Sequence, residues 1–125
     1  MTPEAFDRWL VAYGSAWEAR DAGKFSAIFT DDVRYYWTPF GPPKEGREGV
    51  AAAFSGAVEN QRNIRFRHEI LTASETRCVA RWWCELERPT TGRQVRLEGI
   101  LMIVPTSDGL SAEFREWWHS EEQSG

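Results

Sequence analysis

Apolar and polar residues recur with a helical period in the first half of the chain. Spacings of three and four residues join six apolar positions into one stripe, which predicts a helix over residues 3–22: Phe6, Trp9, Leu10, Tyr13, Ala16 and Trp17. Thr2 can cap this helix, and Pro3 suits its first turn. A short helix is predicted over residues 24–30. A third helix follows the turn at 46–49 and carries Val50, Phe54 and Val58 on one side.

After residue 62 the period changes from helical to alternating, which is typical of strands: residues 64–72, 76–88, 93–104 and 110–119. PTTGR at 89–93 and PTSDG at 105–109 are typical of hairpin turns, and residues 31–37 predict one more strand. Helices followed by a meander predict an α+β fold. Its curved, mainly antiparallel sheet would have its concave face covered by three N-terminal helices. We expect one domain over residues 1–120 and a flexible tail at 121–125.

Two ionisable residues fall on positions that the alternation assigns to the apolar, inner face of the sheet. These residues are His68 and Glu116. A buried carboxylate without a partner is costly and tends to take up a proton. We therefore expect Glu116 to be paired, protonated, or facing a pocket. His68 is the expected partner, and a His–Glu pair in an apolar cavity could act as general acid and base.

Structural roles for both residues remain open at this stage. A histidine on an apolar strand face is commonly a hydrogen-bonded core residue, and Glu116 could instead bond Tyr13 or Arg81. A slip of one residue in the last strand would turn Glu116 outward. The same slip would bring Arg115, Trp117 and His119 inward.

The outer face of the sheet should also carry large apolar side chains among its charges. The alternation places four there: Trp83, Ile100, Met102 and Trp117. A monomer rarely leaves such a patch exposed. We therefore expect a homodimer formed through this face.

Composition narrows the classes of partner. The 125 residues carry a formal net charge of -4 without a run of Lys or Arg, which argues against binding to nucleic acid. No apolar run is long enough to span a bilayer and the N-terminus lacks a signal-peptide pattern, so no membrane contact and a cytoplasmic location are expected. Cys78 and Cys84 would lie about 20 Å apart on one strand, as free buried thiols. Two Cys and two His without close spacing do not indicate a metal site.

Three motifs resemble those of the nuclear transport factor 2-like superfamily, especially its SnoaL-like and ketosteroid isomerase-like branches: FTDDV (29–33), PFGPPKEGREGV (39–50) and REWWH (115–119). The resemblance covers nearly the whole chain. It implies a cystatin-like, cone-shaped α+β barrel with a deep apolar pocket, usually dimeric through the sheet and without a required metal. In this superfamily the same pocket serves isomerases, dehydratases, cyclases, an epoxide hydrolase and non-catalytic binding proteins, so the fold does not decide the reaction.

The residues that ketosteroid isomerase uses are replaced in this sequence. Thr38, or Trp37 with a shifted register, stands where the resemblance places the catalytic Asp. Ala16 stands in the place of the oxyanion Tyr, and a position near Leu101 in the place of the second oxyanion donor. Thr cannot replace a carboxylate base and Leu cannot donate to an oxyanion. Isomerisation by that set of residues is therefore rejected.

Two hypotheses for function follow. In the first, the protein is an enzyme without a cofactor that cyclises, dehydrates or isomerises a polyketide-, steroid- or terpene-like molecule. Glu116, His68 and Tyr13 would be its catalytic residues, and the substrate would be bound by Trp17, Tyr35, Trp37, Phe54, Trp82, Leu101 and Trp118. In the second, the same pocket binds a small apolar ligand without turnover, or the domain serves dimerisation alone.

Overall fold

Residues 1–123 form three helices and six strands, and all of them except the two-residue strand Lys44–Glu45 were predicted in this order. The structure is a computed structural model and describes residues 1–123. Its elements are α1 (Pro3–Ala19), α2 (Ala22–Ser26), β1 (Phe29–Tyr36), β2 (Lys44–Glu45), α3 (Gly46–Val58), β3 (Arg62–Ala73), β4 (Cys78–Glu87), β5 (Gln94–Pro105) and β6 (Ser111–Glu122).

The first helix ends three residues earlier than predicted, for a local reason. Arg20 adopts a left-handed backbone conformation with φ of 55°, which closes α1. The Asp21 side chain then accepts a hydrogen bond from the Lys24 backbone N–H at 3.0 Å and caps α2. A cap at this position starts α2 at Ala22, so the second helix begins two residues before its predicted start, while the apolar stripe stays whole within α1.

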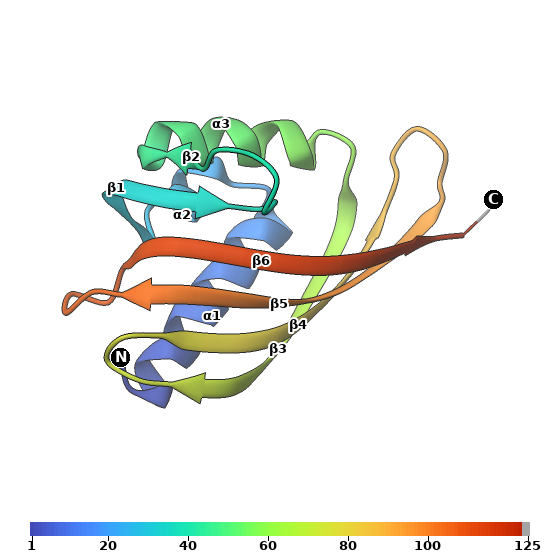
Figure 1. Cartoon of the computed structure of the whole chain (residues 1–125). Helices are drawn as coiled ribbons and strands as arrows, with labels where there is room; N and C mark the ends of the chain where they lie inside the picture. Colours follow the sequence, from blue (N-terminus) through green and yellow to red (C-terminus); the bar gives the residue numbers. More distant parts are fainter. Residues whose placement is uncertain (124–125) are drawn as a thin grey trace.

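The strands form one curved sheet in the order β2-β1-β6-β5-β4-β3. β3 to β6 make the predicted antiparallel meander, and β1 runs parallel to β6. Figure 1 shows α1 crossing one face of the sheet and α3 lying beside β1 and β2. The predicted α+β fold, with helices on one face of a mainly antiparallel sheet, is confirmed.

The C-terminal end of β6 differs from the prediction. β6 continues to Glu122, beyond the boundary set at residue 120, because it pairs with β5 as far as Val95. The backbone N–H of Gln123 adds a hydrogen bond to the Gln94 carbonyl. The last part of the predicted tail, residues 124 and 125, lies outside the described residues.

The inner face of the sheet carries a continuous aromatic core. Trp9 and Tyr13 of α1 pack against Phe114 of β6, and the ring of Tyr35 stacks on Phe114 with 4.4 Å between centroids. In β4 the predicted alternation is confirmed, because its five inward residues are buried: Cys78, Ala80, Trp82, Cys84 and Leu86. This core fixes the face from which the site is built.

Gly99 of β5 allows two tryptophans on the neighbouring strands to lie close together. It pairs with Trp82 on β4 and with Trp118 on β6. A Cβ at position 99 would lie 2.9 Å from Cζ2 of Trp82 and 2.8 Å from Cβ of Trp118. Both contacts are too short to be tolerated without movement of the sheet.

Gly99→Ala is therefore expected to lower the free energy of unfolding by about 1–3 kcal/mol, as overpacking does in a filled core. Gly56→Ala in α3 is the matched control, because a Cβ at position 56 would meet no atom within 4 Å. It should raise stability by about 0.5–1 kcal/mol through helix propensity. Urea denaturation of both variants measures the difference, and a Gly99→Ala protein as stable as wild type would contradict the packing argument.

Candidate active-site pocket

A pocket of about 340 Å³ opens between the inner face of the sheet and the helices. Its volume lies at the small end of the range of roughly 300–1,000 Å³ that is typical of ligand sites. Six of the seven residues that were predicted to bind substrate line it: Trp17, Tyr35, Trp37, Phe54, Trp82 and Trp118. The walls are mainly aromatic and aliphatic, which suits a flat apolar ligand.

Leu101, the seventh predicted residue, does not line the pocket. It is fully buried in β5, directly opposite Glu116 of β6. Alternation placed it on the correct face, but that face is partly covered by other side chains. The expected substrate contact at Leu101 is therefore corrected to a packing position beside the site.

Glu116 is the acidic side chain that the fold places in this pocket. Its side of β6 faces inward, and the residue is 9% exposed. Removal from water raises the pKa of its carboxyl to about 8, although a hydrogen bond from Tyr35 lowers the pKa in part. At neutral pH the group is therefore mostly protonated, as the sequence predicted for a buried carboxyl without a charged partner.

Two tyrosines connect to this carboxyl. Tyr13 of α1 and Tyr35 of β1 both line the pocket, and the Tyr35 hydroxyl lies beside both the Tyr13 hydroxyl and the Glu116 carboxyl. Burial, and then the nearby Glu116 charge, hold the pKa of both phenols well above 10. Both hydroxyls therefore stay protonated and can donate hydrogen bonds throughout the neutral range.

His68 does not pair with Glu116, which corrects the predicted His–Glu pair. Its Nε2 lies 2.7 Å from Oδ1 of Asp7 on α1. His68 is on β3 and Glu116 on β6, so three strand spacings, about 14 Å, separate them. Two residues can share a face and still lie three strands apart on it. The alternative partner Arg81 is also excluded, since it bonds Glu98 on the outer face.

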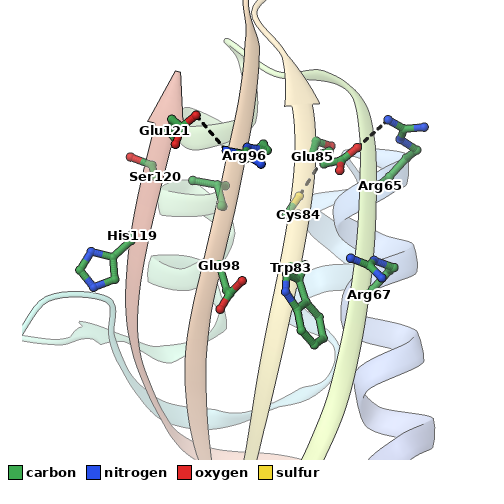
Figure 2. Close-up of a pocket in the computed structure, with 11 residues that line it drawn as sticks. Arg65, Arg67, Trp83, Cys84, Glu85, Arg96, Glu98, His119, Ser120 and Glu121 are labelled. Atoms are coloured by element: carbon green, nitrogen blue, oxygen red, sulfur yellow. Dashed lines mark hydrogen bonds and ion pairs between the residues drawn. The ribbon is translucent and has the colours of Figure 1, made fainter. Parts of the chain in front are cut away.

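A second hollow of about 660 Å³ lies on the outer face of the sheet (Figure 2). Its charged residues are largely paired with one another, as in Arg65–Glu85 at 2.7 Å and Arg96–Glu121 at 2.9 Å. Burial raises the pKa of the neighbouring Cys84 thiol to about 12, so it remains protonated and a poor nucleophile. The inner pocket, with its perturbed carboxyl, is therefore the better candidate for chemistry.

Sequence reasoning missed a polar end of the inner pocket. Gln61, Arg88 and Ser120 line it together with the aromatic residues. Ser120 could have been found, because it follows Glu116 and Trp118 with the period of two residues. Gln61 and Arg88 stand at the ends of elements, where no periodicity indicates direction.

The structure also bears on metals and membranes. Among residues 1–123, no three His, Cys, Asp or Glu side chains gather closely enough to hold a metal ion. Within the same residues, none of the helices combines the length and apolar character that a membrane crossing needs.

Comparison with known proteins gives one family and many similar structures. The family model described as "SnoaL-like domain" matches residues 10–119. No curated protein sequence matches the chain. A ketosteroid isomerase from Mycobacterium sp. is 17% identical, with a TM-score of 0.78 and coverage of 95% of this chain and 98% of its own.

Two further structures match with comparable identities and TM-scores. The epoxide hydrolase/cyclase-like enzyme SalBIII, of pyran ring formation in the polyether salinomycin, is 14% identical, with a TM-score of 0.77 and coverage of 95% of both chains. A computationally designed 17-OHP binder is 18% identical, with a TM-score of 0.72 and coverage of 92% of this chain and 96% of its own. At such identities the likeness establishes the fold alone.

The raised pKa of Glu116 predicts a pH dependence of stability. Between pH 4.5, the ordinary pKa, and about 8, the folded protein holds a proton that the unfolded chain has lost. Stability conferred by this group is thus fully present below pH 4.5 and is lost as the pH rises towards 8. Because one proton is involved, the free energy of unfolding should fall by at most about 1.4 kcal/mol per pH unit.

Glu116→Gln keeps a neutral side chain of similar shape and should remove this dependence. In urea denaturation, wild type and variant should have similar free energies of unfolding at pH 5, and the variant should be the more stable at pH 8. Glu85→Gln, at an exposed position, is the control and should follow wild type. A constant difference between wild type and Glu116→Gln across this range would mean that the carboxyl pKa is not raised.

Proposed function

The chain belongs to the SnoaL-like domain family, and we propose that it is an acid–base enzyme without a cofactor, acting on a small and largely apolar molecule. The observation that carries the proposal is the position of Glu116, a carboxyl with a pKa of about 8 in an aromatic pocket. A group with a pKa near the working pH is suited to moving protons in either direction. Isomerisation, dehydration and cyclisation are reactions that need no more than such transfers and correct positioning.

The roles of the three polar residues follow from their bonds. Protonated Glu116 would give its proton to the substrate, and the resulting carboxylate would then accept a proton from a second position. Tyr35 donates to this carboxylate and Tyr13 contacts Tyr35, so both would hold the carboxyl in one orientation. His68 has no part in this proposal because Asp7 holds it at the far edge of the sheet.

The second hypothesis, binding without turnover, keeps the same pocket and assigns Glu116 only the recognition of a polar group. One of the similar structures is a designed binder, so the architecture is compatible with binding alone. The perturbed carboxyl supports catalysis, because a pocket that only binds apolar molecules has no need of a proton donor. A test of proton abstraction separates the two hypotheses.

5-Nitrobenzisoxazole is a suitable probe, since this flat apolar molecule opens its ring when a base removes its carbon-bound proton. Wild-type protein should accelerate the ring opening, with a rate that rises with pH around a midpoint near 8 as Glu116 ionises. Glu116→Gln should lower the rate at least tenfold. Tyr35→Phe should move the midpoint upward, because the bond that it removes lowers the pKa of Glu116. Absorbance of the phenolate product gives the rates.

Glu85→Gln again provides a control, since its carboxylate is exposed on the outer face. Quenching of the pocket tryptophans would show that the probe binds wild type. If the bound probe reacts no faster with wild type than with Glu116→Gln, proton transfer by Glu116 is ruled out. The binding hypothesis would then remain.

We also propose that two copies of the chain associate through the outer face of the sheet. Trp117 is 49% exposed there, while Trp83, Ile100 and Met102 are partly covered. Neighbouring charges cancel in pairs across the strands, and the guanidinium of Arg81 lies 4.4 Å from the centroid of the Trp83 ring. A face with balanced charge and central aromatics suits contact with its own copy about a two-fold axis.

Trp117→Glu should convert such a dimer to a monomer at micromolar concentration, because it adds an unpaired charge to the centre of the contact. Val11→Glu is the matched control on α1, where Val11 is 52% exposed outside this face. Light scattering during size-exclusion chromatography measures the mass of each. Equal masses for wild type and Trp117→Glu would contradict the proposed interface.

A further inference from the structure

We propose that the polar end of the pocket, formed by Gln61, Arg88 and Ser120, binds an anionic group of the ligand, a carboxylate in the simplest case. This inference rests on the proposed function, because it describes the same ligand and pocket. It adds the chemical class: an amphipathic acid whose apolar body extends towards Glu116.

Arg88 is held in place with donors to spare. Its Nε donates to Oε1 of Glu122 at 3.1 Å, and its Nη1 donates to the Asn60 carbonyl at 3.0 Å. A guanidinium has five N–H groups, so three remain without a bonded partner among residues 1–123. The side chain is 26% exposed and lines the pocket. It is therefore positioned to bind an acceptor that enters there.

Gln61 is oriented so that it also offers donors. Its Oε1 accepts a hydrogen bond from the Trp17 indole Nε1 at 2.8 Å. Indole N–H can only donate, so the partner atom must be the amide oxygen, and the orientation of the amide is fixed. Its NH₂ group remains for the pocket. Together with the Arg88 guanidinium and the Ser120 hydroxyl, this end of the pocket is rich in donors.

In the ion-pair cluster at this end, cations outnumber carboxylates. Arg88 and Arg93 both contact the carboxylate of Glu122, at 3.1 Å and 3.7 Å, so two cations meet one anion. Glu121 is already paired with Arg96. Glu116 is mostly protonated at neutral pH and so does not oppose an anion. Arginine is suited to a carboxylate because its planar fork matches the two oxygens.

The strand itself sets the length of the ligand. Glu116, Trp118 and Ser120 alternate along β6 and all line the pocket. Four residues of extended strand separate the first from the last, a span of about 13 Å. A ligand with its anionic group at Arg88 would need a rigid apolar body beside Trp118 to reach Glu116. Flat aryl or polycyclic carboxylic acids have this shape.

Biphenyl-4-carboxylate and biphenyl-4-carboxamide are matched probes, because they share the apolar body and differ in charge. At pH 6, titration calorimetry of wild type should give at least tenfold tighter binding of the carboxylate. Arg88→Gln should weaken carboxylate binding about tenfold, the loss of one charged hydrogen-bonded contact, and change carboxamide binding less than threefold. Arg93→Gln, which removes the same charge outside the pocket lining, should weaken carboxylate binding clearly less than Arg88→Gln does and leave carboxamide binding nearly unchanged.

Gln61→Glu provides a second variant that retains the acceptor for Trp17. It replaces the NH₂ group with negative charge and should weaken only the carboxylate. Ala53→Phe should abolish binding of both probes if they occupy this pocket, since Ala53 is in its lining.

The outcomes separate this inference from the proposed function. Equal affinities of the two probes for wild type, or equal losses in Arg88→Gln and Arg93→Gln, would overturn the anionic end and leave the apolar pocket intact. Failure of both probes to bind wild type would contradict the ligand pocket itself, and this inference with it.

Discussion

A carboxyl group held out of water on the apolar side of a sheet is the constraint on which the site depends. Burial of Glu116 raises the pKa of its carboxyl to about 8, and a hydrogen bond from Tyr35 offsets only part of this effect. The fold accepts the group because the carboxyl can be neutral at the working pH. Acid–base capability and a cost in stability at high pH are thus two consequences of one placement.

The register of β6 keeps this carboxyl in position. β6 lies between β1 and β5, and its pairing places Glu116 opposite Leu101 and Trp118 opposite Gly99. Gly99 leaves room for Trp82 and Trp118 on either side, where a Cβ would collide with both. Aromatic packing around Phe114 fixes the same face from the helix side. The apolar wall and the acid are therefore products of the same strand pairing.

The two faces of the sheet differ in how their charged residues are arranged. On the outer face, cations and carboxylates alternate across strands and neutralise one another around Trp83. In the inner pocket, the positive charge is at the polar end, on Arg88, while Glu116 lies among rings. Similar structures at 14–18% identity include an isomerase, a cyclase-like enzyme and a binder, so the shared fold does not decide the function.

Periodicity alone determined the type of each helix and strand except β2, the faces of the strands and the unusual inward position of Glu116. Each of these depends on residues that are near in sequence, where a period of two or 3.6 leaves a direct signal. The tertiary structure decided which inward residues meet. His68 and Glu116 share a face but lie three strands apart. Tyr35 instead interacts with the carboxyl, because β1 lies beside β6. No local sequence pattern encodes that position of β1. Lateral strand order is set by packing of the whole sheet, and so the partners of Glu116 could not be predicted from alternation.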